Sequence, residues 1–371
     1  MATPPPTKTH TKRLDFVDSL RGLAALYVIL FHMVLVPTTK LILPKWLEPL
    51  IMNGGTGVTL FFIISAFTLC YTLQFQRNEN NYLRKFYLRR IFRILPLYYV
   101  LLIVSFGLTH SFRHILHYRY DLLLYSTFGY NFVPGKQEGL VWASWTLGVE
   151  MVFYAIFPFI FYLVKSLKHA LMFLIVTLVL AWVNNYLIEY LISANTISKG
   201  SFNLGMSFFF QLPVFATGIV CYYLHENYFK GKLIDIKYNK IILFVGLILF
   251  FALPYFVFGT YFKGSRIYVM AVVYSMIFLG LSKVSIKLIV NKFTVFLGAI
   301  SYSTYLNHPR IVYSLNKVYV HIYNICKNES VSILVCSLVT LAFLIPISYI
   351  TYRIIETPLI NYGRNLIKKM K

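Results

Sequence analysis

Acidic residues are scarce in this chain. Asp and Glu number 12 among 371 residues, against 35 Lys and Arg, and charged residues make up only 13%. Soluble domains carry about 25% charged residues, so this chain has too little charge to cover the surface of a soluble enzyme. Hydrophobic residues reach 58% and the mean hydropathy is +0.67, which argues against a basic nucleic-acid-binding protein. The composition predicts an integral membrane protein with basic loops and no nucleic-acid partner.

Cysteines are also few, and their irregular spacing predicts neither a disulfide framework nor a metal site. The four are Cys70, Cys221, Cys326 and Cys336. The first residues are basic and rich in Pro and Thr, without an apolar stretch before a cleavage site, which argues against a cleaved signal peptide. We interpret the whole chain as a single membrane domain, with a basic N-terminal tail at 1–13 and a short basic C-terminal tail at 357–371.

Apolar windows separated by polar interruptions predict an all-α bundle of about ten transmembrane helices. Each span needs about 20 apolar residues, which leaves no room for an extramembrane domain of ordinary size. The segment 109–142 is less regular and is either an outer loop or a partly re-entrant segment. The predicted helices lie near 16–37, 56–76, 87–108, 143–164, 170–192, 204–224, 241–259, 266–282, 293–316 and 331–353.

The distribution of Lys and Arg predicts that both termini are cytoplasmic. In that orientation 24 of the 35 cations face inward and 11 face outward, which follows the positive-inside rule. The two halves of the chain share no motif order, which argues against an inverted-repeat transporter.

Two ionisable residues share one face of the first predicted helix. Arg21 and His32 are eleven positions apart, and eleven steps of about 100° return to within about 20° of the starting direction. The helix thus presents a cation toward the cytoplasm and an imidazole about 16 Å deeper. Ionisable groups at membrane depth default to functional hypotheses. The structural alternatives are a helix–helix hydrogen bond for His32 and a lipid-headgroup anchor for Arg21.

Glu150 is a third ionisable group at membrane depth. It lies about 10 Å below the outer boundary of its predicted span, and His32 lies about 8 Å below the same boundary. A carboxylate beside an imidazole orients it and raises its basicity, so we expect Glu150 to pair with His32. The alternative is a carboxylate that extends to the membrane interface.

Arg90 and Arg93 lie one helical turn apart at the cytoplasmic end of the third predicted span, and so they face the same way. Two guanidinium groups on one face suit a phosphate or diphosphate group, because the planar fork binds such groups through two hydrogen bonds. Anchoring to anionic lipid is the alternative.

Six short motifs follow one another along the chain. They are Asp18 to Gly22 with His32; Gly57 to Ser65; Arg90 to Pro96; Trp145 to Glu150 with Tyr154 and Pro158; Ser301 to His308; and Glu356 to Pro358. In this order they resemble the membrane-bound acyltransferase family 3, although Ala66 replaces a glycine that is usual in the second motif. The chain stops soon after Glu356, so it resembles the short stand-alone members without a fused hydrolase-like domain.

The resemblance implies transfer of an acyl group, usually acetyl, from cytoplasmic acyl-CoA to a hydroxyl group of a glycan. It implies a catalytic role for His32 and donor binding by the arginines. Acetyl-CoA is then a donor substrate, not a permanently bound cofactor. The predicted catalytic residues are His32, Glu150 and Arg21; the donor-binding residues are Arg90, Arg93 and Arg21; the acceptor-binding residues are Ser301, Tyr302, His308, Asp18 and Trp145.

Two versions of the chemistry fit the sequence. In the first, His32 removes the proton from the acceptor hydroxyl as its oxygen attacks the thioester. In the second, His32 itself forms an acyl intermediate. In either version Glu150 would orient the imidazole or stabilise its protonated form, and polar groups near Ser301 would hold the acceptor or the developing oxyanion.

Two other classes of protein remain open. A proton-coupled transporter or lipid-linked sugar flippase would use Arg21, His32 and Glu150 as a proton relay, although the later helices are nearly uncharged. A scaffold subunit would have these residues by accident. For the enzyme, the resemblance favours a surface polysaccharide such as O-antigen as acceptor, with a lipid-linked oligosaccharide or a smaller glycoside as alternatives. It also favours the bacterial inner membrane, with lipid as a partner, and leaves the oligomeric state open.

Overall fold

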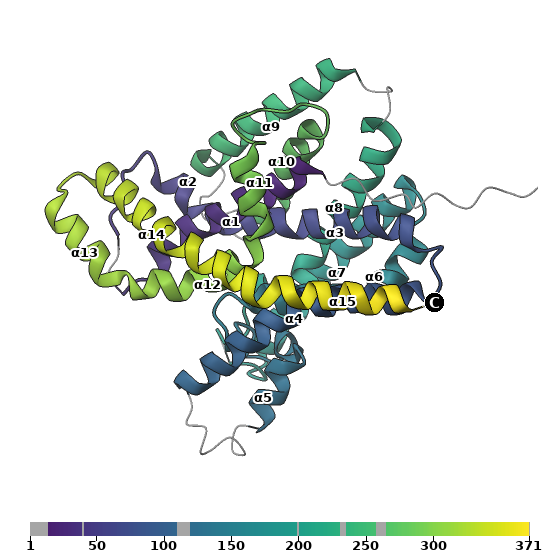
Figure 1. Cartoon of the computed structure of the whole chain (residues 1–371), viewed down its shortest axis with the longest axis horizontal. Helices are drawn as coiled ribbons and strands as arrows, with labels where there is room; N and C mark the ends of the chain where they lie inside the picture. Colours follow the sequence, from purple (N-terminus) through teal and green to yellow (C-terminus); the bar gives the residue numbers. More distant parts are fainter. Residues whose placement is uncertain are drawn as a thin grey trace, which may run out of the picture.

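Every regular element of the described chain is a helix, as expected (Figure 1). The computed structural model describes residues 14–38, 41–109, 119–198, 200–230, 235–256 and 265–370. The longer helices are α1 (Asp15–Leu35), α3 (Gly57–Gln76), α4 (Tyr82–Thr109), α6 (Trp145–Leu163), α7 (Leu167–Ser193), α8 (Phe208–Leu224), α9 (Ile236–Phe256), α10 (Arg266–Leu281) and α14 (Glu329–Thr351). The shorter ones are α2 (Glu48–Met52), α5 (Arg119–Ser126), α11 (Lys292–Ala299), α12 (Ser301–Ser314), α13 (Asn316–Ile325) and α15 (Thr357–Lys369).

Eight helical stretches in the described residues are long and apolar enough to cross a membrane. The predicted count of about ten is therefore not confirmed. Helix α10 has only 16 residues, and the span expected at 293–316 is broken at Ile300 into α11 and α12. The residues that follow Ile300 are largely polar, whereas α11 is apolar, and the predicted span joined the two segments. The cytoplasmic location of both termini remains a prediction.

The irregular segment at 109–142 is partly helical where it is described. Residues 110–118 lie outside the described part of the chain, as does the predicted tail at 1–13. After α5, a short 3-10 helix (Gly129–Phe132) packs on the bundle. Its Tyr130 hydroxyl donates to the Ser144 carbonyl at 2.7 Å, and the Asn131 amide donates to the Met206 carbonyl at 2.8 Å. These bonds attach the segment to the start of α6 and to the turn before α8.

The end of the chain forms one long helical rod. Helix α14 continues through a π-helical turn (Tyr352–Glu356) into α15. In Figure 1 the two helices run end to end, with α15 beside α4. The range 357–369, predicted as part of a basic tail, is thus helical. The π-turn places the buried Glu356 where Ser303 of α12 donates a hydrogen bond to its carboxylate.

Two glycines allow α1 and α11 to pack with their backbones in contact. A Cβ atom at Gly298 would lie 1.9 Å from the Asp18 carbonyl oxygen, and one at Gly22 would lie 2.8 Å from the Gly298 nitrogen. Both distances are far below van der Waals contact, so only glycine fits. This packing fixes the face of α1 that carries Asp18 and Arg21 against the start of α12.

Replacing Gly298 with Ala is expected to destabilise the protein, because the new methyl group collides with the Asp18 backbone, which cannot rotate away as a side chain could. Overpacking of this kind costs about 1–3 kcal/mol. Thermal unfolding in detergent measures the loss. Gly205→Ala is the matched control, because a Cβ there would approach only the Asn203 side chain, at 3.3 Å. Equal melting temperatures for the two variants would contradict close packing of α1 on α11.

Candidate active site

Two neighbouring cavities lie between α1, α3, α4 and α12. The narrow one has a volume of about 90 Å³ and the wide one about 580 Å³. Both are lined by the same five residues at the point where they meet, which are Arg21, Arg90, Arg93, Ser301 and Tyr302. The narrow cavity continues toward α6 and ends among Thr146, Glu150 and Tyr305. The wide cavity continues toward α15.

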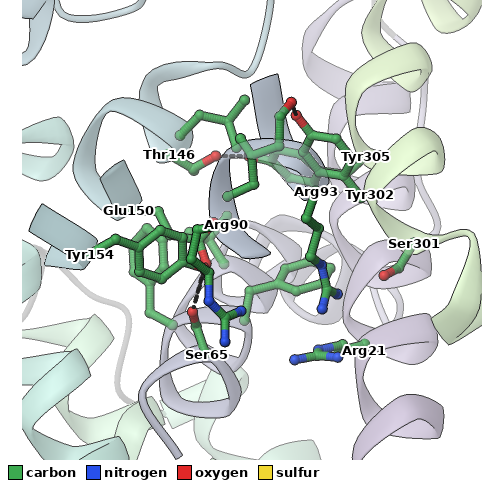
Figure 2. Close-up of a pocket in the computed structure, with 15 residues that line it drawn as sticks. Arg21, Ser65, Arg90, Arg93, Thr146, Glu150, Tyr154, Ser301, Tyr302 and Tyr305 are labelled. Atoms are coloured by element: carbon green, nitrogen blue, oxygen red, sulfur yellow. Dashed lines mark hydrogen bonds between the residues drawn. The ribbon is translucent and has the colours of Figure 1, made fainter. Parts of the chain in front are cut away.

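Three guanidinium groups gather at this junction. Arg21 comes from α1, Arg90 and Arg93 come from α4, and Figure 2 shows the three groups turned toward the same space. Arg21 donates to the Thr68 hydroxyl at 3.2 Å and lies 3.7 Å from an Asp18 carboxylate oxygen. Two more carboxylates, Glu150 and Glu356, line the cavities on either side of this junction. The three guanidinium groups face the open space between them and suit an anion there.

The other two arginines have few partners within the described chain. The Arg90 guanidinium carbon lies 5.8 Å from the centre of the Phe86 ring and 5.5 Å from that of Tyr154, which are cation–π contacts. Its Nε atom is buried without a hydrogen-bond partner. Arg93 is exposed to both cavities and forms no hydrogen bond or ion pair with another described residue. The predicted arginine pair is therefore available to a ligand.

Glu150 contacts groups other than those we predicted from its depth. Its carboxylate accepts a hydrogen bond from the Ser65 hydroxyl at 2.6 Å and another from the Tyr154 hydroxyl. The expected pair between Glu150 and His32 is wrong. Matching depth specifies only one coordinate of a side chain, and α6 directs Glu150 toward α3 and the narrow cavity, whereas His32 contacts α12.

His32 pairs with a second histidine. Its Nδ1 atom lies 3.0 Å from Nε2 of His308 and 3.0 Å from the Val28 carbonyl oxygen. The two ring centres are 4.8 Å apart. His308 is fully buried on α12 and lines neither cavity. His308, which we predicted to bind the acceptor, thus contacts His32 and is not exposed to either cavity.

A proline determines how His308 is protonated. Pro309 lies inside α12 and has no N–H group, so it cannot donate to the Tyr305 carbonyl four residues earlier. That carbonyl instead lies 2.5 Å from Nδ1 of His308. A carbonyl oxygen only accepts, so in the neutral ring Nδ1 carries the proton and Nε2 has a lone pair. Nε2 then accepts from Nδ1–H of His32, which leaves the lone pair of His32 on its own Nε2.

The histidine pair lies one aromatic ring beyond the narrow cavity. Tyr305 lines the end of that cavity, and its ring centre is 5.5 Å from that of His308. The Tyr305 hydroxyl accepts a hydrogen bond from Thr146 at 3.1 Å, and its ring packs against Phe61 at 5.7 Å. The Tyr305 ring and His308 thus link the narrow cavity to His32, which itself lines neither cavity.

Comparison with known proteins agrees with this site. Residues 14–352 match the family model described as acyltransferase domain. The chain belongs to the acyltransferase 3 family. The predicted family and enzyme class, a membrane-bound acyltransferase, are confirmed.

Two curated relatives are named as acetyltransferases. The peptidoglycan O-acetyltransferase OatA of Listeria monocytogenes is 25% identical over 188 residues, which are 44% of this chain and 26% of the relative. The putative acetyltransferase ORF330 of Acidianus two-tailed virus is 29% identical over 297 residues, 79% of this chain and 81% of the relative. The chain thus covers about a quarter of the bacterial relative and most of the viral one. No solved structure matches.

The remaining predicted residues of this acyltransferase lie at different distances from the cavities. Asp18 lines the wide cavity, and Ser301 and Tyr302 line both. The Ser301 hydroxyl donates to the Gly298 carbonyl at 2.9 Å, and that of Tyr302 to the Ile94 carbonyl at 2.6 Å. Trp145 lines neither cavity and packs edge-on against Phe62. The structure therefore brings together all but one of the acceptor and donor candidates around the cavities and the histidine pair.

Several residues of the acyltransferase site had no predicted role. Ser65 and Tyr154 lie in the motifs that carry the family resemblance, and their bonds to Glu150 give them a place in the narrow cavity. Arg89 lines the wide cavity but is bonded to Gln76 and Glu79. Arg364 was counted only as a cytoplasmic cation, and no motif marked it. Within the described residues, no three His, Cys, Asp or Glu side chains gather to hold a metal ion.

Proposed function

We propose that this protein transfers an acetyl group from acetyl-CoA to a hydroxyl group of a surface polysaccharide, such as O-antigen, at the bacterial inner membrane. The observation that carries the proposal is the arginine-lined cavity whose narrow end, at Tyr305, lies one aromatic ring from the His32–His308 pair. The arginines provide cations for a polyphosphate, and the histidine provides a base. The relative named as a peptidoglycan O-acetyltransferase supports acetyl as the group and a polysaccharide as the acceptor.

The spacing of the two charged ends suits this donor. Arg21 and His32 lie on one face of α1, about 16 Å apart along the helix axis. The pantetheine arm of CoA has about a dozen bonds between its phosphate and its sulfur, which extend to roughly 14 Å at the length per bond of an extended chain. A diphosphate bound by Arg21, Arg90 and Arg93 therefore places the thioester near the level of His32.

In the direct reaction, Nε2 of His32 takes the proton of the acceptor hydroxyl as its oxygen attacks the thioester carbonyl. The tetrahedral intermediate breaks its C–S bond, and the CoA thiolate takes the proton back from the His32 imidazolium. In the two-step version the same lone pair attacks the thioester carbonyl, the C–S bond breaks and CoA leaves as a thiolate. The acceptor oxygen then attacks the acetyl-imidazolium, its C–N bond breaks, and the hydroxyl proton passes to the CoA thiolate. In both versions we assign His308 as a positioning residue, because it holds the His32 proton on Nδ1.

Glu150 contributes through the narrow cavity. One carboxylate oxygen accepts from Ser65 and Tyr154, and we assign the other to accept from an amide N–H of the pantetheine arm. Ser301 and Tyr302 line the same passage and are the candidates for holding the acceptor or the developing oxyanion.

Membranes incubated with acetyl-CoA labelled on its acetyl group and with a polysaccharide acceptor test this function. We expect label on the polysaccharide together with an equal amount of free CoA thiol. A proton-coupled transporter or flippase would move the glycan without consuming thioester, and a scaffold subunit would do neither. Transfer of a labelled acetyl group from a different acyl donor, but not from acetyl-CoA, would contradict the assignment of CoA.

Replacing Arg93 with Ala is expected to raise the KM for acetyl-CoA about 10- to 100-fold with little change in kcat, because hydrogen bonds to charged groups contribute about 1.5–3 kcal/mol. Initial rates over a range of donor concentrations measure the two constants. Arg77→Ala is the matched control, because Arg77 follows the end of α3 and lines neither cavity. An unchanged KM with reduced thermal stability would favour the alternative role of Arg93 in lipid anchoring.

A further inference from the structure

The C-terminal helix α15 forms one wall of the wide cavity. Ile360, Gly363, Arg364 and Ile367 line it, and their spacing of three and four residues places them on one face of the helix. Lys368 and Lys369, at the end of the same helix, do not line it. One cation of α15 therefore faces the cavity, although a helix that only lies on the membrane surface directs its cations toward lipid headgroups.

Helix α15 is held against α4 by close packing. A Cβ atom at Gly363 would lie 2.6 Å from the Phe92 ring, and the Phe92 and Tyr362 rings pack edge-on with their centres 5.6 Å apart. Directly before the helix, the Glu356 carboxylate accepts a hydrogen bond from Ser303 of α12. The start and the middle of α15 are thus held by α12 and α4, which both line the cavities, so Arg364 has a defined place on the cavity wall.

The cations of the wide cavity come from the helices α1 and α4 on one hand and from α15 on the other. Arg21, Arg90 and Arg93 lie at the junction with the narrow cavity. Arg364 comes from α15, next to Gly363, which packs on Phe92 of α4. Arg364 forms no ion pair with a described acid, whereas Arg89 is bonded to Glu79 at 3.2 Å. Within the described residues, α15 thus offers the cavity one guanidinium group that is not ion-paired.

Acetyl-CoA likewise carries phosphates in two places. A diphosphate joins the pantetheine arm to the ribose, and a third phosphate lies on that ribose. We propose that Arg364 on α15 binds the ribose phosphate of CoA while the arginines of α1 and α4 bind the diphosphate. This proposal rests on the proposed function, and it makes α15 the part of the protein that distinguishes CoA from donors that lack the third phosphate.

A comparison of two donors tests the proposal. Wild-type protein, Arg364→Ala and the matched control Arg353→Ala are assayed with acetyl-CoA and with acetyl-dephospho-CoA, which lacks the ribose phosphate. Arg353 is exposed on the same rod and does not line the cavity. We expect Arg364→Ala to raise the KM for acetyl-CoA about tenfold, wild type to show a similar increase with acetyl-dephospho-CoA, and the variant to show no further increase with that donor.

The outcomes separate this proposal from the proposed function. If Arg364→Ala raises the KM by the same factor for both donors, the proposal is overturned. Arg364 would then bind a lipid phosphate or serve only the packing of α15. An Arg364→Lys variant that keeps most of the preference for acetyl-CoA would support it, because it retains the charge. If the wild-type protein transfers acetyl from neither donor, the proposed function itself is contradicted, and with it the role of Arg364.

Discussion

The His32→Ala variant is expected to lose acetyl transfer by at least about 10³-fold while the protein still folds in the membrane. General-base catalysis alone contributes about 10²–10⁴-fold, and an acyl-histidine intermediate would be impossible without the ring. The side chain is only partly buried and has Val28 and His308 as its hydrogen-bond partners. Its removal therefore leaves the helix packing intact, and the rate of label transfer from acetyl-CoA is the measurement.

A second histidine variant provides the control for this experiment. His321 lies on α13, is exposed, and lines neither cavity, so His321→Ala changes the same atoms outside the site. It should transfer acetyl at the wild-type rate. Full activity in His32→Ala protein, at equal amounts of folded protein, would rule out both versions of the mechanism.

Helix positions were predictable because they depend on composition. The predicted spans at 16–37 and 170–192 correspond to α1 and α7, with bounds that differ by only a few residues. Hydropathy reports whether a residue is apolar, and the predicted span at 293–316 ran across Ile300, where the largely polar start of α12 follows the apolar α11. It likewise gave no account of α15, whose packing depends on the contact between Gly363 and Phe92.

The arginine cluster was predictable and the histidine pair was not. Arg90 and Arg93 lie one turn apart on a single helix, so spacing alone shows that they face the same way. The partner of His32 lies 276 residues away, on a different helix. Depth estimates pointed to Glu150, because they give a position along the membrane normal and no direction around the helix. A signal was present in the dipeptide His308–Pro309, since a proline within a helix leaves a carbonyl that a nearby side chain can bind.

The largest remaining effect expected is that of His308. His308→Leu removes the acceptor for Nδ1–H of His32, so the ring is free to move its proton to Nε2 and lose the basic lone pair that faces the substrate. The Val28 carbonyl still lies 3.0 Å from Nδ1, so the loss is partial, and we expect kcat to fall about 10- to 100-fold with an unchanged KM for acetyl-CoA. Removal of the orienting partner of a catalytic histidine in a serine protease costs about 10⁴-fold, which sets the upper limit.

Two conservative variants separate this positioning role from simple packing. In His308→Gln, the side-chain oxygen is as many bonds from the backbone as Nε2, so it can accept from His32 and should restore most of kcat; in His308→Asn the oxygen reaches only the Nδ1 position and should not. Pro309→Ala supplies a backbone N–H that competes for the Tyr305 carbonyl, so His308 is held less firmly and kcat should fall severalfold. Gln and Leu variants with equal activity would show that His308 only fills space. Both side chains occupy the pocket, but only Gln can accept the hydrogen bond from Nδ1–H of His32.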